Sequence, residues 1–308
     1  MTVSATPVET THRSPRPLSL TATLDRLGHG RGDPCHRVTP DGALWRTSLM
    51  PSGPVSYRLV QVDRHSVACR AWGAGAAEFA TTLPDLLGEH DDATGFAPEH
   101  PTLAEALRRL PGLRIPRTGR VFEALVPAIL EQKVHGIAAQ ASWRRLVTAH
   151  GTAAPGPAPD GMRVPPSAQV WRRIPSWEFH RAGVDPRRSR TIVTAAAVGS
   201  RLEAAAAMTP AAALARLRVV DGIGEWTAAE VAQRAFGDAD ALSVGDFHLA
   251  ATVGWSLLGR PLDDAAMVEY LEPLRPHRYR VVRLLEVSGQ AVKPKFGPRT
   301  PVTDHRDR

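Results

Sequence analysis

The chain has 308 residues and carries 38 Lys and Arg against 31 Asp and Glu, which gives a net charge of +7 and a pI near 10.2. That balance favours an acidic partner such as nucleic acid, although a GC-rich genome would raise arginine, alanine, glycine and proline together. The two cysteines, Cys35 and Cys69, lie far apart and have no metal-ligand spacing, so neither a disulfide framework nor a zinc or iron–sulfur site is indicated. No apolar run approaches the roughly 18 residues of a membrane span, and the N-terminus lacks a signal-peptide core, so we expect a cytoplasmic protein.

The first predicted elements are short. Residues 1–16 are rich in Pro, Arg and Thr without apolar periodicity, which predicts a disordered tail. Within residues 17–90, turn signals separate four strand-like segments: LSLTATL, ALWRTSLM, VSYRLVQV and SVACRAW. This stretch is therefore predicted to be a small N-terminal domain of mixed α/β structure.

From Leu83 onward the apolar period becomes helical, as in LAEALRRL, VFEALVPAILEQ, IAAQASWRRLVTAHG and PAAALARLR. A Pro/Gly-rich connector at 151–167 interrupts this pattern, Thr209-Pro210 signals a helix start, and Gly237 signals a helix stop. Residues 91–291 are thus expected to form a mainly α-helical region, and residues 292–308 a second disordered tail. The predicted fold class is α+β.

Residues 217–236, LRVVDGIGEWTAAEVAQRAF, carry the most informative pattern. An apolar turn of helix runs into Gly222-Ile223-Gly224, and Thr227 then opens a second helix of small residues. Glycines permit the positive φ of a tight hairpin, and the backbone N–H groups at such a turn bind phosphate. Asp246 follows Trp226 by 20 positions and precedes another apolar helix.

The hairpin and Asp246 together resemble the helix-hairpin-helix (HhH-GPD) DNA glycosylase superfamily, and within it the DNA-3-methyladenine glycosylase II family. The segments PGLRIP at 111–116, ILEQKV at 129–134 and WEFH at 177–180 support the resemblance by their order. The resemblance implies a small sheet-containing, TBP-like N-terminal domain followed by two helical lobes with the active-site cleft between them.

By this resemblance Asp246 is the catalytic carboxylate. An alkylated purine is positively charged and leaves readily, so a carboxylate that stabilises the developing sugar cation and orients a water is sufficient. Helix capping is the alternative role for an aspartate in this position. Relatives that also cut the strand carry a Schiff-base lysine where this chain has Trp226, so the resemblance implies a monofunctional enzyme without lyase activity.

The base pocket is expected to include Trp226, Glu230 and Glu286. In the relatives a tryptophan at the first position stacks on the electron-poor base, although ordinary core packing would also suit Trp226. Glu230 and Glu286 stand where relatives carry aromatic residues, and solvated helix faces are the alternative for both. The loss of these aromatic surfaces leaves the lesion range open.

The resemblance also implies a set of DNA contacts. Lys133 occupies the position of an apolar wedge that fills the gap left by the flipped base, and Gln132 is a second candidate for that role. The expected DNA-binding residues are Gln132, Lys133, Val134, Gly222, Ile223, Gly224 and Thr227. The backbone carbonyls of Val220 and Ile223 could hold a monovalent or divalent cation, and no other cofactor is expected.

Three functions remain open. The first is a monofunctional glycosylase that removes alkylated purines of the 3-methyladenine type in base-excision repair. The second is a glycosylase for oxidised, deaminated or bulky lesions, and the third is a non-catalytic protein that binds damaged DNA. In each case the expected partner is double-stranded damaged DNA in the nucleoid, and a monomer is sufficient.

Overall fold

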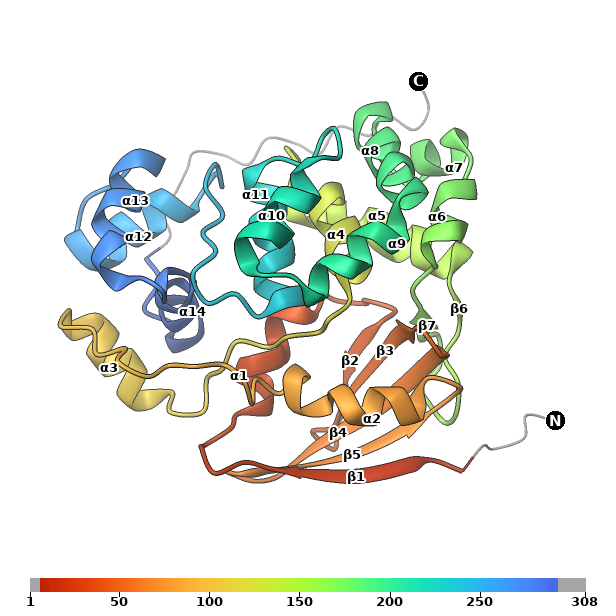
Figure 1. Cartoon of the computed structure of the whole chain (residues 1–308), viewed down its shortest axis with the longest axis horizontal. Coiled ribbons are helices and arrows are strands. Elements are labelled where there is room, and N and C mark those ends of the chain that lie inside the picture. The colour runs from red at the N-terminus through yellow and green to blue at the C-terminus, as the bar shows by residue number, and fades with distance from the viewer. Residues whose placement is uncertain (1–5, 293–308) are drawn as a thin grey trace.

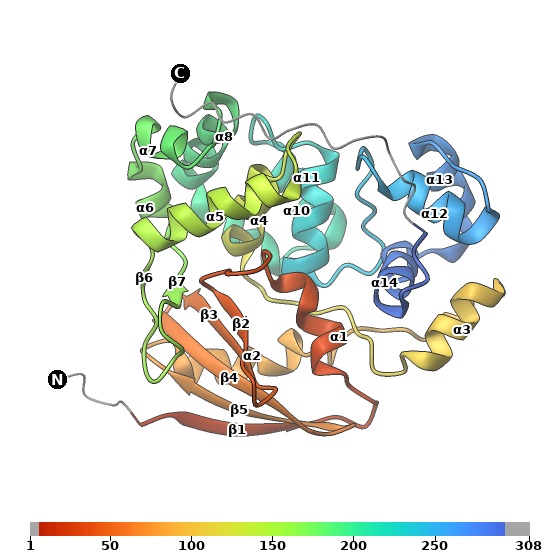
Figure 2. The ribbon, with the colours of Figure 1, turned by 180° about the vertical axis from the view of Figure 1, so that it is seen from behind.

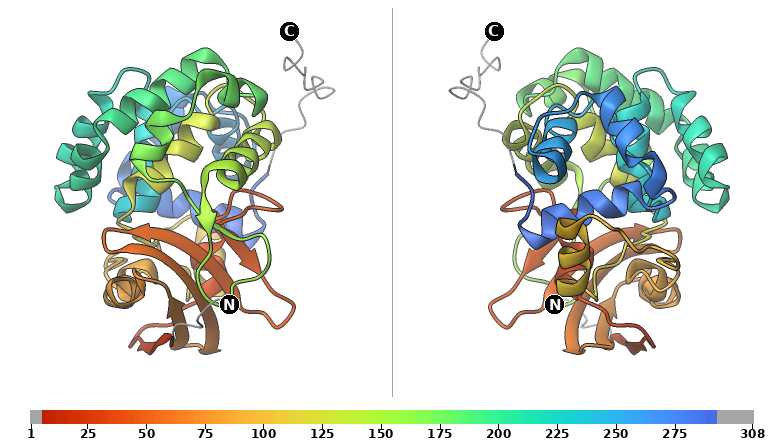
Figure 3. Two further views of the ribbon diagram at one scale, coloured as in Figure 1. Left: turned by 90° about the vertical axis from the view of Figure 1, so that its right-hand side faces the viewer. Right: turned by 90° about the vertical axis from the view of Figure 1, so that its left-hand side faces the viewer.

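A computed structural model of the chain describes residues 6–292. A five-stranded antiparallel sheet in the order β1-β5-β4-β3-β2 forms the core of the N-terminal domain, and the helical lobes lie together beside it, with α2 apart from them against the sheet (Figures 1 and 3). The strands are β1 (Val8–Arg13), β2 (His36–Val38), β3 (Leu44–Met50), β4 (Gly53–Asp63) and β5 (Ser66–Trp72). The predicted α+β class is confirmed.

Both faces of the sheet are covered. On one face, apolar side chains of the sheet pack with α1 (Leu20–Leu24) and α2 (Ala76–Leu86), where the rings of Tyr57 and Phe79 stack at 3.8 Å. On the other face, Trp45 and Trp72 stack at 5.3 Å and pack against Met162. Met162 belongs to the Pro/Gly-rich connector, which forms the short hairpin of β6 (Thr152–Ala153) and β7 (Arg163–Val164). The connector therefore closes the sheet's second face.

Two predictions for the N-terminal part are wrong. Residues 8–13, expected in a disordered tail, form the edge strand β1, which pairs from Val8 opposite Ala71 to Arg13 opposite Ser66. Its polar composition suits an edge strand that is only half buried, so composition alone was misleading. LSLTATL is not a strand, because the Ser19 hydroxyl accepts a hydrogen bond from the Ala22 N–H and starts α1. Residues 1–5 and 293–308, parts of the two expected tails, lie outside the described residues.

Two large hydrophobic cores divide the helical region into two lobes. The first lobe consists of α4 (Val121–Leu130), α5 (Gly136–His150), α6 (Ala168–Arg173), α7 (Ser176–Arg181), α8 (Pro186–Ala197), α9 (Gly199–Glu203), the 3-10 turn η2 (Ala204–Ala207), α10 (Pro210–Arg218) and α11 (Glu225–Val231). A π-helical turn, η3 (Ala232–Phe236), extends α11 and ends at Gly237 with φ 68°. The predicted helix start at Pro210 and stop at Gly237 are confirmed.

The second lobe joins distant parts of the chain. It contains α3 (Pro101–Arg109), α12 (Leu249–Leu258), α13 (Asp264–Leu271), η4 (Glu272–Leu274) and α14 (Arg278–Ser288). Leu103 of α3 shares one core with Val253, Met267 and Leu284, so α3 packs with helices that follow the first lobe in sequence. Figure 1 shows these helices together at the left, beside the first lobe.

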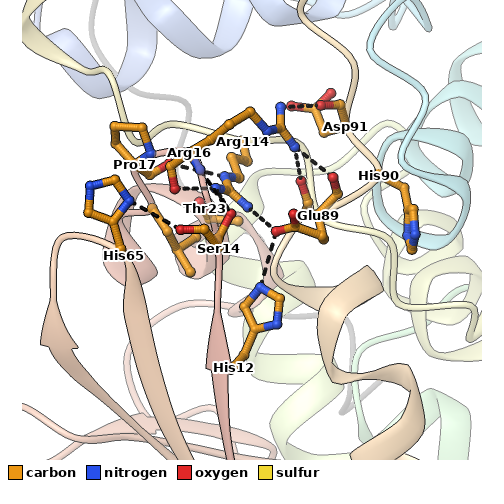
Figure 4. A network of polar contacts seen from close by, with 12 residues as sticks. His12, Ser14, Arg16, Pro17, Thr23, His65, Glu89, His90, Asp91 and Arg114 are labelled. Carbon is orange, nitrogen blue, oxygen red and sulfur yellow. Dashed lines mark hydrogen bonds and ion pairs between the residues drawn. The ribbon is translucent and has the colours of Figure 1, made fainter.

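Arginine side chains bond the N-terminal domain to the second lobe and to the segment between α3 and α4, which contains Arg114. Arg114 donates to Glu89 Oε2 at 2.9 Å and to Ser14 Oγ at 2.7 Å (Figure 4). Asp91 forms a fully buried pair with Arg280 of α14. Arg283, also of α14, donates to the Ala22 carbonyl at 3.2 Å. These bonds fix α1, which lies between the sheet and the helices (Figure 2), and with it the following 3-10 turn η1 (Asp25–Leu27).

Candidate active site

The hairpin between α10 and α11 is built around one obligatory glycine. Gly222 has φ 87°, and a Cβ placed there would lie 2.2 Å from Thr191 Oγ1. The Ile223 N–H closes the turn on the Val220 carbonyl at 3.0 Å, and the side chains of Ile223 and Val220 are buried in the first-lobe core. Gly224, at φ −88°, directly precedes α11 and needs no left-handed backbone. Positive φ is therefore required at Gly222 alone.

Asp246 is held at both of its carboxylate oxygens. Oδ1 accepts hydrogen bonds from the N–H groups of His248 and Leu249, at 2.8 and 3.0 Å, at the start of α12. Oδ2 accepts from Trp226 Nε1 at 3.2 Å. Capping and a role in a site are thus compatible, because one oxygen fixes the side chain to the helix while the other faces the hairpin helix α11.

Asp246 lines a cavity of about 210 Å³ between α11 and the second lobe. Leu249, Val253 and Leu285 form part of its apolar wall. Trp226, expected in the base pocket, does not line this cavity and is half buried, and its indole contacts Asp246 instead. The cavity is large enough for a purine-sized ligand, and Asp246 is part of its lining.

Glu230 and Glu286, both predicted for the base pocket, line this cavity. Glu230 is buried, with 2% of its surface exposed, so the solvated-face alternative fails for this residue. Its carboxylate accepts from Arg234 Nη1 at 2.8 Å and from Ser243 Oγ at 2.5 Å. Burial acts to raise the pKa of Glu230, but the neighbouring charges of Arg234 and Arg26 outweigh it and lower the pKa to about 2.

Arg26 is a cavity residue that sequence reasoning missed. It lies in η1 of the N-terminal domain, and its guanidinium is 3.6 Å from Glu230 Oε2 and 3.9 Å from Glu286 Oε1. Glu286 also accepts from Arg283 at 2.8 Å. No local motif marks Arg26, because only the packing of η1 against α14 brings it to a site formed by residues far along the chain.

The turn after α4 is joined to the hairpin. Gln132 Nε2 donates to the Gly222 carbonyl and to Thr227 Oγ1, both at 2.9 Å. The next residue, Lys133, is exposed and has φ 55°, a left-handed conformation that few non-glycine residues adopt. Val134 packs partly buried against the first-lobe core. The amide of Gln132 is therefore engaged by the hairpin, whereas Lys133 stands at the tip of the turn.

Residues 6–292 contain neither a membrane span nor a cluster of metal-binding side chains. No helix in this part of the chain is long and apolar enough to cross a membrane. Nor do any three His, Cys, Asp or Glu side chains gather there in a way that could hold a metal ion. Cys35 and Cys69 are both buried free thiols.

Comparison with known proteins identifies the family. No family model matches the chain. The chain is 31% identical over 259 residues to the probable bifunctional transcriptional activator/DNA repair enzyme AlkA of Mycobacterium tuberculosis, an alignment that covers 79% of this chain and 49% of that protein. It belongs to the AlkA-like helix-hairpin-helix DNA glycosylase family. The chain spans about half the length of this AlkA relative.

Solved structures share the fold. The 3-methyladenine DNA glycosylase from Archaeoglobus fulgidus superposes with a TM-score of 0.72 at 16% identity, over 91% of this chain and 98% of that one. The 8-oxoguanine glycosylase/lyase of Clostridium acetobutylicum, in complex with double-stranded DNA containing cytosine opposite 8-oxoguanine, gives 0.68 at 13% identity, over 91% and 98%. Both the N-terminal sheet and the two helical lobes of this AlkA-like protein are thus shared with these two structures.

The hairpin glycines give a matched pair of variants. Gly222→Ala forces a side chain into a left-handed residue and against Thr191, so we expect it to lower the free energy of unfolding by roughly 1–3 kcal/mol. Gly224→Ala meets no atom within 4 Å and should change stability by less than about 0.5 kcal/mol. Urea unfolding followed by circular dichroism measures both, and equal stabilities of the two variants would contradict this account of the turn.

The buried Glu230 predicts a pH-dependent contribution to stability. Because its pKa falls from an ordinary value near 4.5 to about 2 on folding, the stabilisation is complete above pH 4.5 and is lost as the pH falls toward 2. Glu230→Gln should therefore cost about 3 kcal/mol at pH 7 and progressively less below pH 4.5. Urea titrations across this pH range test it. Glu178→Gln, which breaks the exposed pair with Arg181, is the control and should cost less than about 1 kcal/mol at any pH.

Proposed function

We propose that this protein is a monofunctional DNA glycosylase that hydrolyses the N-glycosidic bond of alkylated purines, of the 3-methyladenine type, during base-excision repair. The observation that supports it most strongly is the position of Asp246, at a purine-sized cavity and hydrogen-bonded to the helix that follows the hairpin. Family membership supplies the chemistry that such a carboxylate performs. About half of the AlkA relative has no counterpart in this alignment, so the proposal concerns base release alone.

In the proposed reaction, the lesion base swings out of the duplex and enters the cavity. The bond between C1′ of the deoxyribose and the purine nitrogen breaks, and its electron pair neutralises the positive charge of the alkylated base. Asp246 stabilises the cationic sugar and accepts a hydrogen bond from the water that attacks C1′. The proton from that water passes to solvent through the carboxylate, leaving an abasic site and the free base.

Trp226 supports the proposal that this glycosylase is monofunctional. A lyase needs an amine that attacks C1′ and forms a Schiff base, whereas an indole nitrogen is a donor only and is not a nucleophile of this kind. Here the indole N–H donates to Asp246 Oδ2. Trp226 therefore orients the carboxylate in this protein and supports hydrolysis rather than strand cleavage.

The proposed DNA grip is the edge formed by the hairpin and the turn at 131–135. The backbone N–H groups of Gly222 and Gly224 precede α11 and suit a phosphate, as does the ammonium of the exposed Lys133, whereas the Ile223 N–H is already bonded to the Val220 carbonyl. Gln132 bonds the two segments to each other, so both are presented to the duplex as one rigid surface. Lys133 is the proposed wedge, with its methylenes in the gap and its charge on phosphate.

We further propose that the hairpin carbonyls of Val220 and Ile223 can hold a monovalent or divalent cation. The Val220 oxygen accepts one hydrogen bond, from the Ile223 N–H, and retains a second lone pair for a ligand. A cation there would supply positive charge to a DNA phosphate. The base-release chemistry itself needs no cofactor, and one chain contains the whole cavity, so the proposed active form is a monomer.

A glycosylase for another lesion class is the second candidate. It is favoured by the charged side of the cavity, where Arg26, Glu230 and Glu286 stand in place of aromatic stacking surfaces. A protein that only binds damaged DNA is the third candidate, and the doubly anchored carboxylate at the cavity disfavours it.

Substitution of Asp246 separates catalysis from helix capping. Asp246→Asn keeps an oxygen that can accept from the N–H groups of His248 and Leu249, so α12 stays capped while the negative charge is lost. We expect release of 3-methyladenine from alkylated DNA to fall roughly a hundredfold or more, with little change in stability or in binding to a duplex with an abasic site.

Asp246→Ala is the companion variant, because it also removes the cap and should cost about 1 kcal/mol of stability. Chromatography of released bases and urea unfolding measure the two effects. Normal base release by Asp246→Asn would refute the catalytic assignment, and loss of folding by that variant would refute the capping account.

A further inference from the structure

Two arginines of α8 form a basic surface that the proposed base-release reaction does not use. Arg187 and Arg190 are exposed, and neither guanidinium has a hydrogen-bond or ion-pair partner within residues 6–292. The acidic residue nearest to them in the sequence, Asp185, is bonded to the guanidinium of the buried Arg188, which balances its charge. Both exposed arginines therefore keep their positive charge for a partner outside the chain.

The position of α8 is fixed against both parts of the DNA grip. Arg188 donates to the Leu130 carbonyl at 2.5 Å, at the end of α4 and directly before the turn at 131–135. On the hairpin side, Thr191 lies so close to Gly222 that a Cβ added to the glycine would be 2.2 Å from its Oγ1. The helix, the turn and the hairpin are thus held to one another by direct contacts.

The exposed arginines lie on the part of α8 that is next to the hairpin. Residues three and four positions apart are neighbours on a helix surface, so Arg187 is adjacent to both Arg190 and Thr191. The Thr191 hydroxyl also donates to the Arg187 carbonyl at 3.2 Å. In Figures 1 and 2, α11 lies between α8 and the second-lobe helices α12 and α13. The basic surface therefore continues the DNA grip on the side away from the second lobe.

The hairpin itself brings no positive charge to a phosphate. Asp221 and Glu225 are exposed and stand directly before and after residues 222–224. A phosphate at the hairpin N–H groups would therefore have two carboxylates close to it along the chain. The exposed Lys133 of the neighbouring turn contributes one positive charge, which does not balance both carboxylates. Attraction of DNA to this edge thus depends on basic residues of an adjacent element, and α8 provides them.

We propose that Arg187 and Arg190 bind backbone phosphates of the duplex beyond the hairpin, on the side away from the second lobe; this rests on the DNA binding of the proposed function. The planar guanidinium presents a fork of donors that matches phosphate oxygens. Phosphate contacts fix the position of a protein on a duplex and read no sequence. The protein consequently grips one arm of the duplex more firmly than the other, whatever the lesion.

The salt dependence of DNA binding tests the contact. Binding to a duplex with a stable abasic-site analogue is measured by fluorescence anisotropy at several salt concentrations, for the wild-type protein and for the double variant Arg187→Gln/Arg190→Gln. Each phosphate contact adds about 1 to the slope of log Kd against log salt, so we expect the slope of the variant to fall by about 2. Its affinity at low salt should fall roughly tenfold.

Two further double variants separate charge from structure. Arg187→Lys/Arg190→Lys keeps both charges and should retain the wild-type slope, because counterion release depends on charge. Arg64→Gln/Arg70→Gln is the matched control, since both of its arginines are exposed on the β4–β5 hairpin at the opposite side of the molecule (Figure 1). It should leave the slope unchanged. Urea unfolding establishes that each variant is folded under the binding conditions.

Duplexes with unequal arms test the direction. Each carries the abasic-site analogue with a full helical turn, about 10 base pairs, on one side and less than half a turn on the other. The wild-type protein should bind one of these two duplexes roughly tenfold more weakly than the other, because the short arm of the weaker duplex does not reach α8. Arg187→Gln/Arg190→Gln should bind both alike.

Each result decides for or against the proposal. A wild-type slope in Arg187→Gln/Arg190→Gln, or equal binding of the two unequal duplexes by the wild-type protein, would overturn it while base release leaves the proposed function intact. The same loss in the lysine variant as in the glutamine variant would show a structural role and would also overturn it. Failure of the wild-type protein to bind the duplex would overturn both this inference and the proposed function.

Discussion

The site depends on one carboxylate that is bonded in two directions. Asp246 gives one oxygen to the first N–H groups of α12 and the other to the indole of Trp226. The N-terminus of a helix carries unpaired N–H groups and favours negative charge. The cap therefore stabilises the carboxylate at the cavity by hydrogen bonds that water would otherwise have to supply. The bond to Trp226 then relates this helix to the hairpin that would grip DNA. Capping therefore holds in place the carboxylate that the proposed reaction uses.

Charge pairing stabilises the other ionised side chains that line the cavity. Glu230 is buried and remains ionised only because Arg234 and Arg26 surround it, and Glu286 is balanced by Arg283. Breaking one partner of such a pair is costly, so these residues stabilise each other across elements that belong to the two lobes and the N-terminal domain. The small sheet domain is consequently part of the site. It contributes Arg26, and the bonds of α14 to Asp91 and Ala22 hold that residue in place.

Some features followed from local pattern because their causes are local. The hairpin needs a positive φ at Gly222 and leaves no room there for a Cβ. Gly237 ends a helix in the left-handed conformation, and Pro210 begins another helix. The errors have a local cause too. The strand over 8–13 has the polar composition of a tail because it lies at a sheet edge, and the Ser19 cap outweighed an alternating apolar pattern. Strand pairing at a sheet edge and helix capping depend on hydrogen-bond partners, and the apolar periodicity of a sequence does not show them.

The sequence by itself determined the α+β class, the hairpin, the position of Asp246 and the family to which these residues point, since each is encoded in spacing along one or two neighbouring elements. Only the tertiary structure decided that Trp226 bonds the carboxylate rather than lining the cavity, that Glu230 is buried and ionised, and that Arg26 lines the same cavity. The physical reason is that burial and charge pairing are set by which elements pack together. Here burial and charge pairing join residues separated by most of the chain. A pattern of neighbouring residues does not indicate which distant residues will contact each other.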